Sequence, residues 1–272
     1  MCPNHWQIPP LPPPSVSSNF DVQCRVWNEL PGYLQEKGYS LPENHSDTAL
    51  NVAFRQQGDL WDMFKSKPGS LADFNIQMSR LNSGRRDWYD LYPVQHRLDE
   101  GKSLGPDDTL FVDVAGGLGH QAIAFRNTFP NLEGRVVVQD LKAGMQGHPE
   151  VEGVEFEEQD FFLPQSIQAA RLYYLRWILH DWPDKQASHI LQALVPALAD
   201  DSRVLINEWI IPHRGAGWQM AAQDLNMMSF FTSKERSEEE WNILLDQNGL
   251  KIIAIFRPDD AISECVIECA RK

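Results

Sequence analysis

The chain has 272 residues, of which 42% are hydrophobic, with nine Trp and thirteen Phe. This length suits one large domain, or one domain with an appendage, and the apolar content excludes an intrinsically disordered protein. The net charge of −14 opposes contact with a polyanionic phosphate backbone and so argues against a nucleic-acid partner.

The four cysteines, at positions 2, 24, 265 and 269, show no metal-ligand spacing, so we expect no metal. Cys265 and Cys269 lie in an expected strand, where a rise of roughly 3.3 Å per residue sets them about 13 Å apart, too far for a disulfide. No apolar run approaches the length of about 18 residues that a membrane span needs, and the N-terminus lacks an apolar signal core. We therefore expect a cytoplasmic protein with reduced thiols and no membrane partner.

The N-terminal third divides into two parts. Residues 1–19 are rich in Pro and Ser, which predicts an extended arm. Residues 20–104 carry apolar residues at spacings of three and four, which predicts a helical segment. Four of its apolar side chains are expected to face inward: Trp61, Phe64, Phe74 and Met78.

From residue 105 to 272 the pattern changes to short apolar runs that alternate with helical stretches. Strands are expected at 109–114, 135–139, from Arg171 onward, and at 203–209, 250–256 and 264–269, with helices after the first strand, near 185–198 and at 238–249. Strands that alternate with helices form βαβ units, so this pattern predicts an α/β domain with a mainly parallel sheet.

A glycine-rich turn follows the first strand, with Gly116, Gly117 and Gly119 directly after Asp113. Glycine is needed where a ligand must approach the backbone closely, and Asp140, at the end of the next strand, suits ribose hydroxyls. The turn also satisfies the dinucleotide pattern, with Ala122 in its third place, and it could be a plain structural turn. Asp113 favours a cationic methyl donor over NAD, because a carboxylate there would repel a pyrophosphate.

The segment from Tyr174 to Asp184 runs off the end of an expected central strand, where ligands of open α/β sheets bind. His180 in this position can take a proton from a substrate hydroxyl near neutral pH, and Glu208 and Glu235 can fix its tautomer. The alternatives are an ordinary loop histidine and two solvated glutamates.

Taken together, these motifs resemble the small-molecule O-methyltransferases of plants and fungi, which act on phenols, flavonoids and polyketides. The resemblance spans roughly residues 31–272. Besides the motifs described above, four further segments carry it: 138–141, 159–162, 227–228 and 234–237. It implies a Rossmann-like methyltransferase fold with a seven-stranded sheet, S-adenosylmethionine as cofactor and a small-molecule substrate.

The resemblance also implies roles for individual residues. Gly116, Gly117 and Gly119 would line the cofactor turn with Asp113 beneath them, and Asp140 would hold the ribose. Asp160 and Phe161 would face the adenine, and Arg176 would lie near the cofactor. His180 would be the general base, next to Asp181 and flanked by Glu208 and Glu235. Met227, Met228 and Phe231 would line the acceptor pocket, although ordinary core packing is an equal alternative.

Two departures from the family pattern stand out. Ala115 replaces a commoner Gly in the turn. The sequence also lacks most of the N-terminal dimerisation domain that caps the acceptor pocket in the family. The pocket is then more open, or a homodimer or heteromeric partner completes it, or the protein has left methylation behind.

Three hypotheses follow. The leading one is an O-methyltransferase acting on a phenolic or polyketide-like secondary metabolite. The second is a repurposed enzyme that catalyses a dehydration or pericyclic cyclisation on the same fold. The third is a catalytically silent partner subunit that binds a full-length methyltransferase through apolar residues of the helical segment. An NAD-dependent dehydrogenase would leave His180 and both glutamates unexplained.

Overall fold

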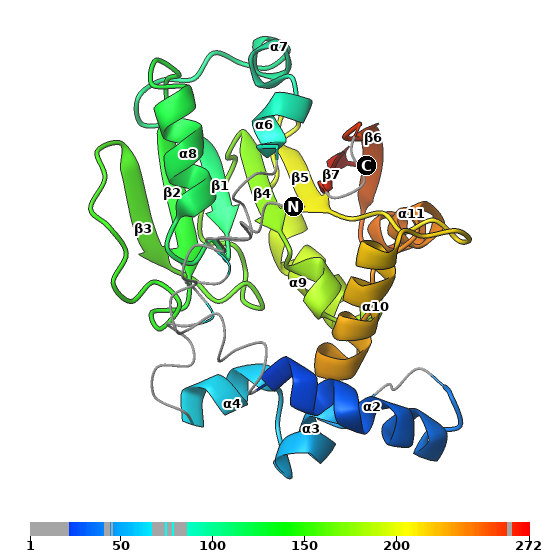
Figure 1. Cartoon of the computed structure of the whole chain (residues 1–272). Coiled ribbons are helices and arrows are strands. Elements are labelled where there is room, and N and C mark those ends of the chain that lie inside the picture. Colours follow the sequence, from blue (N-terminus) through cyan, green and yellow to red (C-terminus); the bar gives the residue numbers. More distant parts are fainter. Residues whose placement is uncertain are drawn as a thin grey trace, which may run out of the picture.

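A computed structural model describes residues 22–40, 44, 46–66, 74, 78, 86–259 and 263–272. The expected arm at 1–19 lies outside these residues. The described chain forms a twisted sheet with helices on both faces and a group of helices below one end of it (Figure 1).

The sheet has seven strands in the order β3-β2-β1-β4-β5-β7-β6. Its pairs are parallel except that β7 runs antiparallel to both β5 and β6. The strands are β1 (Thr109–Val114), β2 (Arg135–Asp140), β3 (Val154–Glu158), β4 (Leu172–Arg176), β5 (Arg203–Glu208), β6 (Leu250–Phe256) and β7 (Cys265–Arg271). This confirms the predicted Rossmann-like α/β fold, and it brings the carboxyl ends of β2, β1 and β4 together.

Two sets of helices cover the two faces of the sheet. One face packs against α9 (Asp184–Leu194) and α11 (Glu238–Gln247), and the other against α6 (Trp88–Leu91), α7 (Val94–Asp99) and α8 (His120–Thr128). Alternation along the strands explains this division, since Tyr173 and Leu175 face the first set while Leu172 and Tyr174 face the second. Within the described chain, no helix has both the length and the apolar character needed to traverse a bilayer.

A third apolar cluster lies outside the sheet. It joins α2 (Cys24–Glu36), α3 (Ala49–Phe54) and α4 (Leu60–Ser66) to the C-terminal half of α10 (Trp218–Phe231). The side-chain amide of Gln23 and the indole N–H of Trp27 both donate to Oδ1 of Asn226, which attaches the N-terminal helices to α10. Figure 1 shows these helices beside the end of α10, below the carboxyl ends of the strands.

Candidate active site

A cavity of about 410 Å³ opens at the carboxyl ends of β1, β2 and β4. The residues that line it come from the glycine turn and the strand ends, from the segment after β4, and from the N-terminal helices. Among the lining residues are Asp113, Gly116, Gly117, Asp140, Asp160, Phe161, Arg176, Trp177, Asp181, Trp182, Trp61, Phe64, Phe74 and Met78. This edge is where ligands of open parallel sheets bind.

The glycine turn after β1 forms the floor of this cavity. A Cβ on Gly116 would lie 2.6 Å from Cγ of Asp113, and one on Gly119 would lie 2.9 Å from the Phe156 ring, so both positions need glycine. Gly117 has φ +57° and no heavy atom within 4 Å of its ideal Cβ, so its backbone is open to an approaching ligand. Ala115 adopts φ +58°, which strains an L-residue by about 1–2 kcal/mol.

Three carboxylates surround the turn. Asp140 accepts hydrogen bonds from the amides of Gly117 (2.8 Å) and Leu141 (2.7 Å), and burial raises its pKa. Asp160 accepts from the amide of Phe162 at 2.9 Å. Asp113 is 3% exposed, and its Oδ2 has no hydrogen-bond partner among the described residues. Burial raises the pKa of Asp113 to about 7.

These features fit an adenosyl amino acid. Paired carboxylates suit ribose hydroxyls and an ammonium group, and a backbone without side chains permits close approach. The unsatisfied oxygen of Asp113 is a buried acceptor that a cationic ligand would satisfy. Arg176 completes this end of the cavity; its guanidinium lies 4.5 Å from the centre of the Trp177 ring and 3.4 Å from Glu264.

An aromatic wall from the N-terminal helices forms the opposite side of the cavity. Trp61 contacts Phe74 edge to face at a centroid distance of 5.5 Å and Phe64 at 5.9 Å, and Met78 lines the same space. The expectation that these four residues face inward is therefore only partly met, because they border an open cavity rather than fill a core. They make the cavity suitable for a flat apolar ligand beside the glycine turn.

His180 lies on a single 3₁₀ turn, Leu179–Asp181, just after β4. Its Nδ1 is 2.9 Å from Oε1 of Glu235, and its Nε2 is 3.5 Å from Oδ1 of Asp181. Burial disfavours the imidazolium, but the carboxylates of Glu235 and Asp181 outweigh it and raise the pKa of His180 to about 10. His180 is 5% exposed and does not itself line the cavity, whereas Asp181, which lies 3.5 Å from its Nε2, does.

Glu208 contacts the turn rather than the imidazole. Its Oε1 accepts hydrogen bonds from the amides of Ile178 (3.1 Å), Leu179 (2.8 Å) and His180 (3.3 Å). Glu235 alone of the two glutamates bonds to the ring. The sequence predicts that both glutamates flank the imidazole. Glu235 contacts the ring, whereas Glu208 contacts the backbone amides of the turn.

The three expected acceptor residues lie on α10 but do not line the cavity. Met227 and Phe231 are buried in the cluster with the N-terminal helices, and Met228 is half-buried. Phe231 packs against Trp61 at 6.2 Å, so it supports the aromatic wall from behind. Their direct role in acceptor binding remains a prediction.

Sequence reasoning missed two groups at this site. Trp177, at φ +54°, and Trp182 line the cavity. Both lie in the segment that contains His180, but neither was predicted as a site residue. Arg236 is fully buried and bonds to the turn that carries His180. Arg236 lies in the polar and charged run 233–240, so nothing local in the sequence indicated that this arginine is buried.

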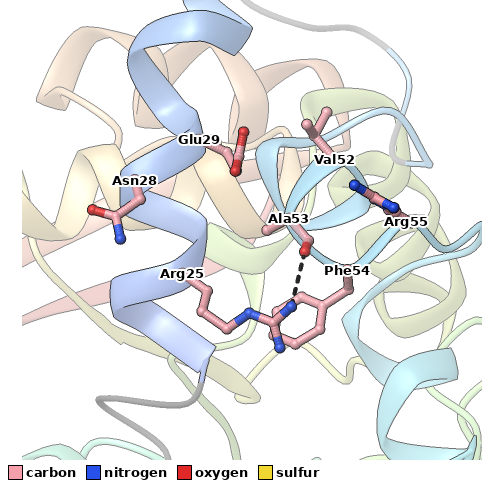
Figure 2. Close-up of a pocket in the computed structure, with 7 residues that line it drawn as sticks. All are labelled: Arg25, Asn28, Glu29, Val52, Ala53, Phe54 and Arg55. Carbon is pink, nitrogen blue, oxygen red and sulfur yellow. Dashed lines mark hydrogen bonds between the residues drawn. The ribbon is translucent and has the colours of Figure 1, made fainter.

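A second hollow, of about 540 Å³, lies between α2 and α3 (Figure 2). There Arg25 donates to the carbonyl of Ala53 at 3.3 Å, and its guanidinium lies 4.4 Å from the centre of the Phe54 ring. It shares no lining residue with the cavity at the sheet edge.

The fold and the cavity together define a nucleoside-cofactor enzyme of the α/β class. A family model described as an O-methyltransferase domain matches residues 107–251, and the chain belongs to this family. A demethylsterigmatocystin 6-O-methyltransferase of Emericella nidulans is 49% identical over 172 residues, which are 63% of this chain and 83% of that protein. A second such enzyme, from Aspergillus flavus, is 37% identical to this chain. The alignment with it covers 88% of this chain but only 61% of that protein.

Solved structures agree with this assignment. A complex of LepI with S-adenosylmethionine (SAM) and a structure described as a pericyclic reaction enzyme each have a TM-score of 0.87 at 31% identity. In each case the alignment covers 95% of this chain and 67% of the other. The recognised family resemblance and the fold are thereby confirmed.

Proposed function

We propose that this chain is a SAM-dependent O-methyltransferase that acts on a phenolic or polyketide-like secondary metabolite. One observation carries the proposal: a single cavity joins the glycine turn and its acids to an aromatic wall, and Asp181, next to His180, lines it. The relatives named as demethylsterigmatocystin 6-O-methyltransferases support the same reaction and substrate class.

In this mechanism Gly117, Asp140, Asp160 and Phe161 would hold the cofactor, with Asp113 below the turn. SAM, when bound, supplies an electrophilic methyl group. His180 accepts the proton of the acceptor hydroxyl at Nε2, while Glu235 at Nδ1 holds the ring and stabilises the imidazolium. A phenol has a pKa near 10, close to that of this histidine, so transfer of its proton to the unprotonated imidazole costs little free energy.

The direct test is mass spectrometry of the full chain with SAM and a panel of phenolic polyketides that includes demethylsterigmatocystin. We expect a product heavier by one methylene group and an equal amount of S-adenosylhomocysteine. Failure to methylate any phenol, with SAM binding intact, would refute the proposal.

A second candidate function is a non-methylating pericyclic or dehydration step. The raised pKa of His180 favours it, because a protonated imidazole donates a hydrogen bond at neutral pH, and so does the likeness to a pericyclic reaction enzyme. A product of unchanged elemental composition, or one lighter by water, formed without consumption of SAM, would select this function.

The charge of Asp113 should control cofactor binding. Because burial raises the pKa of Asp113 to about 7, the ammonium group of the cofactor's amino-acid tail is expected to bind less tightly as this carboxyl becomes protonated. We expect the SAM affinity of the wild type to fall by up to about tenfold per pH unit below pH 7. Asp113→Asn should bind weakly and show no such slope in calorimetry.

Asp107→Asn is the matched control, because Asp107 is exposed in the loop before β1. It should retain both the affinity and the pH slope of the wild type. A wild-type affinity that does not change across this pH range would contradict the proposed contact between Asp113 and the ammonium group of the tail.

The aromatic wall should determine acceptor affinity. Trp61→Ala removes the indole that borders the cavity, and an aromatic contact contributes about 0.5–1.5 kcal/mol, so we expect acceptor KM to rise about 2- to 13-fold. SAM affinity should stay unchanged. Trp218→Ala is the control, since Trp218 is 75% exposed; equal KM values for the two variants would exclude the wall from substrate binding.

Two further expectations belong with this proposal. A homodimer or a heteromeric partner would complete the acceptor side of the cavity, which analytical ultracentrifugation with and without acceptor would detect. A cytoplasmic location is supported by Cys24, Cys265 and Cys269, which are free thiols.

A further inference from the structure

The turn that carries His180 has little to hold it in place by itself. It is one 3₁₀ turn, with backbone hydrogen bonds of 3.2 Å from Asp181 to Ile178 and 3.3 Å from Trp182 to Leu179. The chain enters it through Trp177 at φ +54°, a conformation that strains a bulky residue. A turn this short needs contacts from elsewhere in the fold to fix the imidazole.

Those contacts come from two sides. Glu208 accepts from three amides of the turn, as described above. Arg236, which is 0% exposed, donates from Nη1 to the carbonyl of Leu179 and from Nη2 to that of Trp182, both at 2.7 Å. Its Nε donates to Oδ1 of Asp184 at 2.9 Å, at the start of α9. The guanidinium thus bonds to the turn at Leu179, to Trp182 directly after it and to Asp184 at the start of α9.

Arg236 directly follows Glu235, the residue that bonds to Nδ1 of His180. The segment is itself anchored, because the amide of Glu235 donates to Asp224 at 2.9 Å and the carbonyl of Arg236 accepts from Ile211 at 3.1 Å. Two adjacent residues therefore bind the same turn, one through its imidazole and the other through its carbonyls.

We propose that Arg236 is a positioning residue that sets the separation between the Glu235 carboxylate and the His180 imidazole. The guanidinium suits this role because its planar fork directs several donors at once, whereas lysine has a compact ammonium on a flexible stem. The catalytic part of this inference rests on the proposed function, but the effect on His180 does not.

The alternative is that Arg236 only stabilises the fold, and the chain offers a matched control. Arg171 is 3% exposed, donates to the carbonyls of Leu98 and Lys102, and pairs with Asp201 at 3.0 Å. It has the same set of partners as Arg236, two carbonyls and one aspartate, but none of them belongs to the His180 turn. Arg171→Lys and Arg236→Lys should therefore lose similar stability.

The test compares these two variants by NMR titration of the eight histidines, with the His180 signal assigned by its loss in His180→Gln. Glu235, Asp181 and Glu208 are the carboxylates that act on this ring. In Arg236→Lys we expect the midpoint of His180 to fall by about one pH unit, because its contact with Glu235 loosens. The midpoint in Arg171→Lys should match the wild type.

Kinetics provide the second readout. A displacement of about 1 Å at a reacting group can cost about 100-fold in rate, so kcat of Arg236→Lys should fall by about 10- to 100-fold with SAM affinity unchanged. Arg171→Lys should stay within about twofold of the wild type. If the wild type methylates nothing, the proposed function fails, and the titration still decides the role of Arg236.

The inference is overturned if Arg236→Lys and Arg171→Lys give the same His180 midpoint and the same kcat. Should Arg236→Lys fail to fold, Asp184→Asn carries the test, since Oδ1 of the exposed Asp184 accepts from Nε of Arg236 and lies 2.9 Å from its Nη2. It should shift the His180 midpoint in the same direction by a smaller amount, and an unchanged midpoint would equally refute the role.

Discussion

Replacing His180 by glutamine is expected to lower kcat for methyl transfer by about 10²- to 10⁴-fold, the usual contribution of a general base. Glu235 holds the imidazole at Nδ1, and the unprotonated ring can accept a proton at Nε2, which lies beside Asp181 of the cavity lining. Glutamine retains a polar side chain but cannot accept the phenolic proton. Stopped assays with saturating SAM and acceptor, read by mass spectrometry, give the ratio of kcat values.

The pH profile tests the same assignment. Because the pKa of His180 is about 10 in the folded protein and 6.5 in a model peptide, most of the imidazole is protonated at neutral pH. The rate should therefore rise with pH up to about 10, and Glu235→Gln, which removes the favourable negative charge, should move this limb to lower pH. The stabilisation from the imidazolium is complete below pH 6.5 and is lost as the pH rises to about 10.

His213→Gln is the control for His180→Gln, because His213 lies on the surface, with its side chain 70% exposed. It should leave kcat and SAM affinity unchanged. Full activity in His180→Gln or His180→Ala would refute the assigned base, and a flat pH profile would show that its protonation does not limit the rate.

The fold was predictable where local pattern and tertiary environment agree. The strands Thr109–Val114 and Arg203–Glu208 contain the uninterrupted apolar runs 110–112 and 204–206, because both faces of a central parallel strand are buried. The strand Val154–Glu158 was missed because it lies at the edge of the sheet and contains three glutamates among its five residues. A charged edge strand protects the sheet but resembles a loop in sequence.

The site was predictable to the extent that it depends on backbone. Gly116 and Gly119 are required by contacts with residues nearby, and the strand ends place Asp140 beside Gly117. The pairing of Arg236 with the His180 turn joins segments more than fifty residues apart and leaves no periodic trace in the sequence. The aromatic wall likewise depends on how the N-terminal helices dock.

Trp88→Ala is expected to lower the free energy of unfolding by about 3–5 kcal/mol. The indole is 2% exposed, stacks on Phe111 at 5.5 Å and Phe125 at 5.4 Å, and packs at a tilt against Tyr174 at 4.9 Å. Its removal leaves a cavity between α6 and the centre of the sheet. Since whole domains are stable by only about 5–15 kcal/mol, urea unfolding should show a large fall in midpoint.

This variant also tests the division of the chain. The sequence predicts a methyltransferase domain at 105–272 and a separate helical segment at 20–104. This boundary places Trp88 outside the domain, although its side chain packs in the core of the sheet. Trp218→Ala, at an exposed position, should change stability by less than about 0.5 kcal/mol. Trp88→Phe should cost less than Trp88→Ala, because it keeps an aromatic ring in the stack. If Trp88→Ala unfolds at the same urea concentration as Trp218→Ala, α6 contributes little to the core, and the boundary at 105 gains support.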